Sequence, residues 1–202
     1  MKAMIAAVAG ADPAMAAVVD RSPACVLRRL TPGRPAGRDH FAALAESILY
    51  QQLAGKAAAA IHGRFLALFD GPPTPDRVLG VPYDALRGAG LSGAKARSIS
   101  DLAAKVADGT VQLDGIEGRD DEDVIARLSQ VRGIGRWTAE MFLMFDLGRV
   151  DVWPAGDFGV RKGFAIMHDL ASMPSPAELN TLGDPYRPYR SVAAWYCWRA
   201  AE

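Results

Sequence analysis

The sequence predicts an all-α protein, and three observations carry that prediction. Apolar residues recur at steps of three and four along most of the 202 residues, with alanines between them. The alternation of apolar and polar residues that is typical of strands is almost absent. Half of the residues are hydrophobic, which is enough for one sizeable core or two small ones. At a mean helix length of about 11–12 residues, roughly eight to ten helices are expected.

Residues 1–20 are expected to form a helix. Asp12 and Pro13 interrupt their apolar run well before the roughly 18 apolar residues that a membrane span needs. A signal peptide is the alternative interpretation, but Asp20, Arg21 and Pro23 are typical of a turn rather than of a small-residue cleavage site. We therefore expect a cytoplasmic protein without a membrane partner.

The strongest helical patterns lie in the middle of the chain. Residues 40–69 predict one or two packed helices, which the glycine and prolines after them end. Thr74 is a helix-start residue for a segment that reaches Ala89. Ser92 is a candidate N-cap for a helix over residues 91–106.

The last third of the chain predicts shorter helices. A run of acidic residues precedes residues 124–130, where the dipole of a helix stabilises negative side chains. Glycines and a proline indicate a loop over residues 146–158, followed by a helix over about residues 157–170. Four prolines then separate two short elements from an aromatic final stretch over residues 189–198.

Charge and metal-ligand composition exclude several function classes. The 23 Lys and Arg balance the 23 Asp and Glu, so binding to nucleic acid must depend on local clusters of basic residues. Cys25 and Cys197 are too few for a disulfide scaffold or an iron–sulfur cluster. His40, His62 and His168 share no ligand spacing. We expect no metal held by side chains.

A glycine turn between two helical runs is the sharpest local feature. Gly133 and Gly135 let the backbone turn tightly, and the helix that follows presents unpaired N–H groups suited to a phosphate. Ile134 between them is expected to insert into the core, and Thr138 offers a hydroxyl contact. A plain joint between helices, with glycine as the C-cap, is the alternative interpretation.

The turn is followed by a second distinctive segment. Gly133-Ile-Gly-Arg-Trp-Thr-Ala139 precedes Asp157, which lies in Trp153-Pro-Ala-Gly-Asp-Phe-Gly-Val-Arg-Lys-Gly163. This combination resembles the helix-hairpin-helix DNA glycosylase superfamily, and within it the DNA-3-methyladenine glycosylase II type. The resemblance covers about residues 35–200 and extends through Ser47-Ile-Leu-Tyr-Gln-Gln-Leu53, Gly90-Leu-Ser-Gly-Ala-Lys-Ala96 and Arg187-Pro-Tyr-Arg-Ser-Val-Ala-Ala-Trp195.

The resemblance implies a two-lobed helical bundle with a cleft between the lobes. One lobe spans residues 37–148 and contains the hairpin motif at about residues 121–146, and the other combines residues 1–36 with 149–202. The implied activity is base excision repair. A monomeric glycosylase flips a damaged base out of double-stranded DNA, hydrolyses its bond to the sugar and leaves an abasic site.

Asp157 occupies the position of the family's catalytic aspartate. Positive charge develops on the sugar as the base leaves, and a fixed carboxylate beside it stabilises that charge. A helix N-cap is the other interpretation of Asp157, and the two roles are compatible.

Three aromatic residues correspond to the implied base pocket: Trp137, Trp198 and Tyr50. Trp137 stands where strand-cleaving members of the superfamily carry a Schiff-base lysine, so the resemblance implies no lyase activity. An indole face suits a cationic alkylated base. For both tryptophans, a place in the core is the alternative interpretation.

Further residues correspond to the implied DNA contacts. Gln52 and Leu53 match the loop that fills the gap left by the flipped base, and we leave open which of them is the wedge; Leu53 is alternatively a core residue. The implied phosphate contacts are Gly133, Ile134, Gly135, Arg136, Thr138, Arg161, Lys162 and Arg190. For any single arginine, a solvated surface position or an ion pair within the chain is the alternative interpretation, and the preferred one. No organic cofactor is expected, although in the family the hairpin carbonyls can hold a monovalent cation.

Alkylated purines, 3-methyladenine and 7-methylguanine, are the expected substrates. Their cationic forms have a weakened bond to the sugar, and no acid that would assist a neutral base is found among the motif residues. Two alternatives remain: a DNA-structure-binding protein without catalysis, and a glycosylase for another lesion, such as an etheno or deaminated base.

Overall fold

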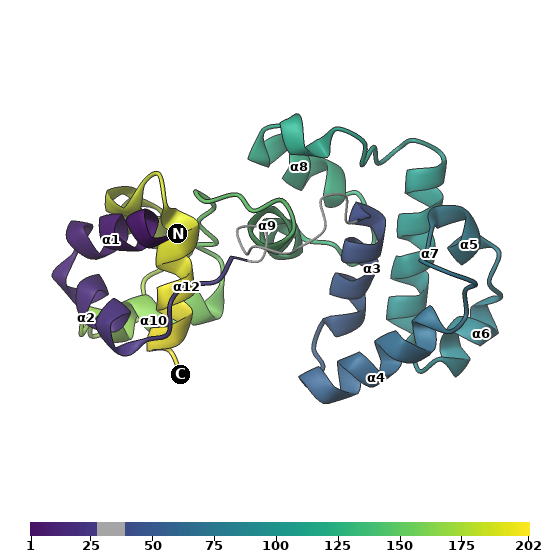
Figure 1. Ribbon diagram of the computed structural model, residues 1–202, viewed down its shortest axis with the longest axis horizontal. Helices are drawn as coiled ribbons and strands as arrows, with labels where there is room; N and C mark the ends of the chain where they lie inside the picture. Colours follow the sequence, from purple (N-terminus) through teal and green to yellow (C-terminus); the bar gives the residue numbers. More distant parts are fainter. Residues whose placement is uncertain (28–38) are drawn as a thin grey trace. The chain divides into compact units, whose positions relative to one another are not determined.

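The computed structural model describes residues 1–27 and 39–202 (Figure 1). These ranges contain twelve α-helices and no strand, so the all-α prediction is confirmed. The expected number of eight to ten helices was too low. Helix breaks at Asp12–Pro13 and at residues 80–82 each divide one predicted helical segment into two. The break at residues 51–54 gives two helices over residues 40–69, where the sequence predicted one or two.

The chain divides into two compact units. Met1–Arg34 with Leu143–Glu202 form the first, here called the terminal unit, and Pro35–Phe142 form the second, here called the central unit. Helix α9 (Arg136–Phe145) contains one of the boundaries between them.

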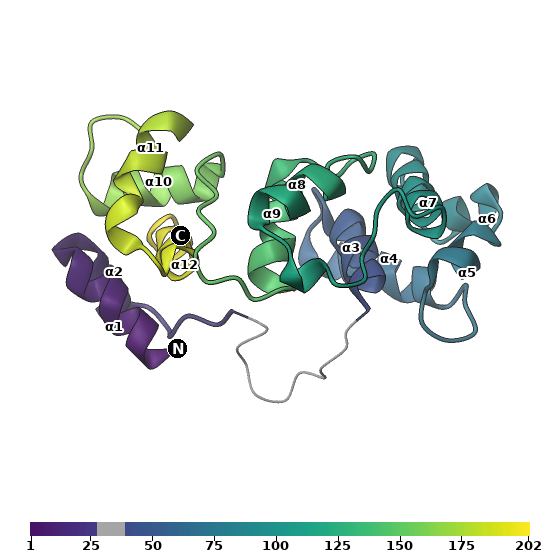
Figure 2. The same ribbon diagram turned by 90° about the horizontal axis from the view of Figure 1, so that it is seen from above.

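The terminal unit is built around its last helix. Its helices are α1 (Lys2–Ala11), α2 (Pro13–Arg21), α10 (Phe158–Met167), α11 (Pro176–Leu182), a short 3₁₀ turn at Asp184–Tyr186, and α12 (Arg190–Ala200). Helix α12 packs against α10, α2 and α1 (Figure 2). Asp12 explains the break after α1, because its Oδ1 caps α2 and Pro13 is the first residue of that helix.

The central unit packs three longer helices with several short ones. Its helices are α3 (His40–Tyr50), α4 (Gly55–Leu66), α5 (Pro75–Leu79), α6 (Tyr83–Gly88), α7 (Gly93–Ala107), a 3₁₀ turn at Ile116–Gly118, and α8 (Asp121–Leu128). The predicted N-caps Thr74 and Ser92 are confirmed, since their hydroxyls accept from the backbone N–H groups of Arg77 and Lys95. Helix α7 buries Ile99 and other apolar residues against α3 and α5.

Candidate functional site

Asp157 is the N-cap of α10 in the terminal unit. Its Oδ1 accepts hydrogen bonds from the backbone N–H of Val160 at 2.7 Å and from the indole Nε1–H of Trp198 at 2.8 Å. The capping interpretation is therefore confirmed, and the indole adds a second donor. Two donors on one oxygen fix the direction of a half-buried carboxylate. Such a group can stabilise positive charge that develops beside it.

Glycines of α10 bring Trp198 to Asp157. A Cβ on Gly159 would lie 2.8 Å from Cδ1 of the Trp198 ring, and one on Gly163 would lie 1.7 Å from the carbonyl oxygen of Cys197. One turn apart, both glycines therefore face α12 and let that helix approach closely. Phe145 stacks on the Trp198 ring with centroids 5.9 Å apart and an interplanar angle of 27°. The indole is thus held from two sides.

The glycine turn joins α8 to α9 in the central unit. Gly133 has a φ of +80°, a conformation that favours glycine, while a Cβ on Gly135 would meet nothing within 4 Å. Ile134 is 3% exposed, which confirms that it inserts into the core. Helix α9 begins at the next residue, Arg136. The turn therefore leaves room for a ligand to approach the main chain at Gly135.

Gln51, which sequence reasoning did not assign, holds this turn. Its Nε2 donates to the carbonyl oxygen of Gly133 at 3.0 Å and to Oγ1 of Thr138 at 3.3 Å. Thr138 is 4% exposed, so its hydroxyl supports the hairpin instead of lying at the surface as the predicted phosphate contact requires. The feature of the sequence that could have pointed to Gln51 is its position in the same segment as the wedge candidates Gln52 and Leu53.

The basic residues predicted to contact phosphates all have partners within the chain. These partners are Glu122 for Arg136, Asp151 for Arg190, and the carbonyl oxygens of Pro174 and Ala201 for Arg161 and Lys162. The Arg136 guanidinium holds the pKa of Glu122 below its usual range. The Arg190 side chain is 15% exposed and forms a two-point ion pair with Asp151. This geometry gives Arg190 a structural role at the start of α12.

Trp137 and the wedge candidates of the central unit lie at its surface. Trp137 is 48% exposed and Leu53 is 38% exposed, so the core interpretation is wrong for both. Gln52 has a φ of +55°, which turns the chain after α3 and presents the loop. Tyr50 is half-buried, and its ring meets His62 edge-on with centroids 5.9 Å apart.

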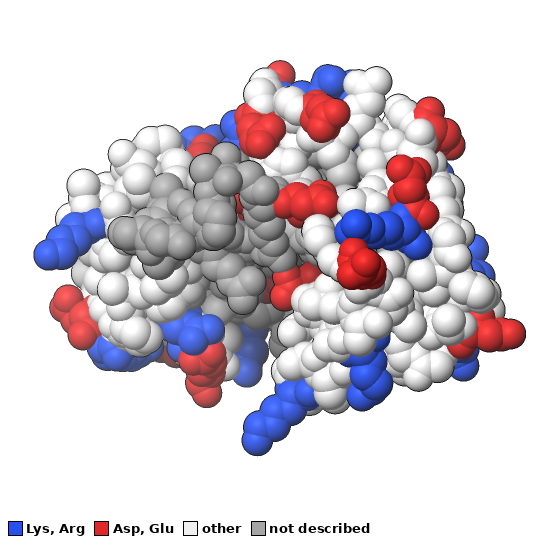
Figure 3. All heavy atoms as spheres, turned by 45° about the vertical axis from the view of Figure 1, so that its right-hand side comes forward, with Lys and Arg blue, Asp and Glu red and all other residues white. Residues whose placement is uncertain are grey.

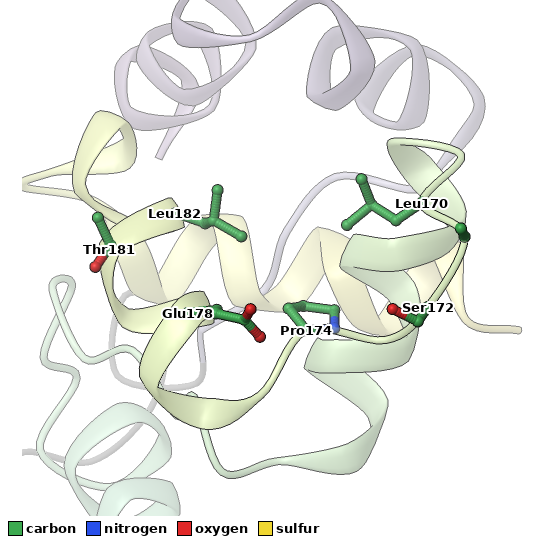
Figure 4. Close-up of a pocket in the computed structure, with 7 residues that line it drawn as sticks. Leu170, Ser172, Pro174, Glu178, Thr181 and Leu182 are labelled. Atoms are coloured by element: carbon green, nitrogen blue, oxygen red, sulfur yellow. The ribbon is translucent and has the colours of Figure 1, made fainter.

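A pocket of about 550 Å³ lies in the terminal unit between the end of α10 and α11 (Figure 4). Its lining includes the exposed side chains of Leu170 and Leu182. None of the predicted base-pocket residues lines it. This pocket is therefore not the base-binding site that the sequence predicts.

Figure 3 shows the distribution of charge on one face of the molecule. On the face in Figure 3, acidic and basic side chains intersperse and form no broad patch of one sign. Burial raises the pKa of Cys25 to about 12 and also raises that of Cys197, which disfavours the thiolate form that a nucleophile requires. Within residues 1–27 and 39–202, no three His, Cys, Asp or Glu residues group as metal ligands. No helix in the described part of the chain is long and apolar enough to cross a membrane.

Comparison with known proteins identifies the family. The model of the HhH-GPD superfamily base excision DNA repair proteins matches residues 45–188, which include the glycine turn and Asp157. The chain belongs to this superfamily. It is 33% identical over 168 residues to DNA-3-methyladenine glycosylase 1 of Schizosaccharomyces pombe, a match that covers 82% of this chain and 74% of that protein.

Two solved structures, both of 3-methyladenine glycosylases by their names, agree with this assignment. The 3-methyladenine DNA glycosylase of Schizosaccharomyces pombe in complex with abasic DNA superimposes with a TM-score of 0.79 at 30% identity, covering 96% of this chain and 94% of that one. A DNA-3-methyladenine glycosidase from Bacillus halodurans reaches 0.83 at 33% identity, covering 98% and 88%. The HhH-GPD assignment therefore rests on both sequence and fold.

Proposed function

We propose that this HhH-GPD protein is a monofunctional DNA glycosylase of the 3-methyladenine II type. Its substrate is double-stranded DNA that carries a cationic alkylated purine, and its product is an abasic site in an intact strand. The observation that carries the proposal is the Asp157 carboxylate, held by the Val160 N–H and the Trp198 indole in a chain that matches the superfamily over residues 45–188.

The chemistry follows from the charge on the substrate. The bond from C1′ to the purine nitrogen breaks with its electron pair going to the purine, so a cationic 3-methyladenine leaves as a neutral base. The sugar acquires the positive charge, which the fixed negative charge of Asp157 stabilises. A water oxygen then bonds to C1′ and its proton passes to the solvent. Because the leaving base is already activated, no acid is needed on its side.

The absence of lyase activity rests on Trp137. Strand cleavage in this superfamily requires an amine that attacks C1′, and this position carries an indole with nearly half of its surface exposed. Its ring instead offers a face for a flipped, positively charged base. We expect the product strand to stay intact until alkali or heat is applied.

The hairpin is the proposed phosphate anchor. Its open main chain at Gly135 and the N-terminus of α9 present N–H groups to one phosphate. A monovalent cation on the hairpin carbonyls stays a prediction. The carbonyl oxygens of Gln130 and Gly133 already accept hydrogen bonds from Lys105 and Gln51, so such a cation would share them or use others.

Release of methylated bases tests the proposal. The Asp157→Asn variant keeps an N-cap side chain but loses the charge, so base release from dimethyl sulfate-treated DNA should fall about 10²–10³-fold, with duplex affinity nearly unchanged. Asp39→Asn is the matched control, because Asp39 caps α3 through the N–H of Phe41. Its release rate should equal that of the parent.

Two other outcomes would redirect the proposal. A parent protein that binds duplex DNA but releases no methylated base would be a DNA-structure-binding protein. Release of etheno or deaminated bases, but not of methylpurines, from single-lesion duplexes would assign a different substrate class.

The comparison of the two proteins also tests the role of Asp157. Equal release by the parent and by Asp157→Asn would remove Asp157 from the chemistry.

A further inference from the structure

One polar face of α7 has no role in the chemistry described above. The segment Gly90–Ala96 runs into this helix, which carries four polar residues at steps of three, three and four: Lys95, Ser98, Asp101 and Lys105. At 3.6 residues per turn, these steps place all four side chains on one side of the helix. We call this set the α7 stripe.

The first residue of the stripe holds the end of α3. The Lys95 ammonium donates to the carbonyl oxygens of Leu49 and Gln51, each at 2.7 Å. Carbonyl groups in the last turn of a helix have no partner within that helix, so Lys95 supplies one. The wedge candidates Gln52 and Leu53 follow directly. Lys95 therefore fixes the root of the wedge loop, residues 51–53.

The other residues of the stripe hold the approach to the hairpin. Asp101 Oδ2 accepts from the backbone N–H of Arg132 at 2.7 Å and from Lys105 Nζ at 2.9 Å. The Lys105 ammonium also donates to the carbonyl oxygen of Gln130 at 2.5 Å. Ser98 lies directly against the turn, since a Cβ on Gly133 would be 2.6 Å from its Oγ. The stripe therefore binds and contacts the main chain on the N-terminal side of the turn.

Gln51 links the wedge loop directly to the hairpin. Its carbonyl oxygen is held by Lys95, and its side chain donates to the Gly133 carbonyl oxygen across 82 positions of sequence. One residue therefore belongs to the root of the wedge loop and contacts the hairpin. All of these contacts lie within the central unit.

We propose that Gln51 and the α7 stripe are positioning residues that lock the wedge loop to the hairpin as one rigid piece. A phosphate bound at the hairpin then sets the depth at which the wedge enters the base stack. This inference rests on the proposed function, because it needs a protein that extrudes a base. The wedge loop is then already ordered before DNA binds, so base extrusion does not have to include the free-energy cost of ordering it.

The test is a double-mutant cycle read by DNA affinity. Two duplexes of one sequence are compared at one salt concentration, the first with a tetrahydrofuran abasic analogue and the second undamaged. Gln51→Ala should lower the ratio of abasic to undamaged affinity about tenfold, because two hydrogen bonds are lost, while undamaged affinity stays within about twofold. Lys95→Met should act in the same direction.

The wedge background separates positioning from folding. In a protein that carries Gln52→Ala and Leu53→Ala, the additional Gln51→Ala change should alter the affinity ratio less than about twofold, since no wedge remains to be positioned. Gln112→Ala, at an exposed glutamine of the same unit, is the matched control and should leave the ratio unchanged. Thermal unfolding of each variant verifies that it is folded.

Several results would overturn the coupling. The first is an unchanged ratio of abasic to undamaged affinity in Gln51→Ala, and the second is a proportional loss of affinity for both duplexes in that variant. The third is an equal effect of Gln51→Ala with and without the wedge residues. The fourth is a parent protein that binds both duplexes with equal affinity. Base release from methylated DNA decides the proposed function separately. Release by the parent together with an unchanged ratio would reject the coupling alone, and a lowered ratio without release would reject the glycosylase alone.

Discussion

The terminal and central units hold their functional groups in opposite ways. In the terminal unit a side chain, Asp157, is fixed because two glycines of α10 let α12 approach and bring Trp198 within hydrogen-bond distance. In the central unit a stretch of main chain, the glycine turn, is fixed by side chains that reach it from Gln51 and α7. The first arrangement should be most sensitive to added volume, and the second to lost hydrogen bonds.

Gly163→Ala should have the largest effect. The new Cβ would lie 1.7 Å from a backbone carbonyl oxygen of Cys197, so α10 and α12 must separate. We expect a loss of about 3 kcal/mol in the free energy of unfolding. Gly63→Ala in α4 is the control, because a Cβ there meets nothing within 4 Å, and it should be neutral or stabilise by about 0.5–1 kcal/mol. Urea denaturation measures both, and equal stabilities would contradict the close-packing argument.

Gly133→Ala tests the same substitution in the central unit. Its positive φ costs about 1–2 kcal/mol for alanine, and its Cβ would meet Ser98 Oγ at 2.6 Å. The neighbour here is the end of a side chain, so adding Ser98→Ala should recover part of the loss. We expect about 2 kcal/mol for the single change and a smaller cost for the pair in chemical denaturation. A double variant no more stable than Gly133→Ala would show that the contact with Ser98 is not the cause.

Trp198→Phe separates the carboxylate-holding role of Trp198 from its predicted role in the base pocket. Phenylalanine can still stack on Phe145 but has no N–H for Asp157, so kcat for release of methylated bases should fall about tenfold with KM nearly unchanged. Trp195→Phe is the control on the same helix, where the ring contacts Tyr196 and Arg199. A rise in KM with kcat preserved would favour the pocket role.

The sequence predicted those functional groups whose residue type and place in a motif are enough to identify them. Asp157 is of this kind, and the burial of Ile134 follows from an apolar residue between two glycines. The N-cap function of Asp12 ahead of Pro13 was also readable from the sequence, but that pair served only as an argument against a membrane span, so a helix boundary was missed.

The supports of the hairpin were not predictable in the same way. Gln51 meets Gly133 across 82 positions, and Lys95 meets Leu49 across 46, so these contacts depend on how α3, α7 and the turn pack together. No local periodicity encodes such pairs. For the same reason, the sequence favoured an ion pair within the chain for any single arginine but did not identify Asp151 as the partner of Arg190, since that partner depends on where the chain returns.

The smallest predicted effect concerns the pH dependence of the hairpin support. Although burial alone raises the pKa of Asp101, the Arg132 N–H and the Lys105 ammonium lower it by more, so this pKa lies below its usual range. The unfolded chain then binds the proton more readily, and the Asp101 contacts stabilise the fold above the unfolded pKa of about 3.9. That stabilisation is lost as the pH falls through the lower pKa that Asp101 has in the folded protein.

Asp101→Asn should therefore lower the free energy of unfolding by about 1 kcal/mol at pH 7, with allowance for the partial exposure of Asp101. The difference in stability from the parent should disappear well below pH 4. Urea denaturation across pH 2–7 measures this. A difference that stays constant over that range would mean that the charge of Asp101 does not support the hairpin.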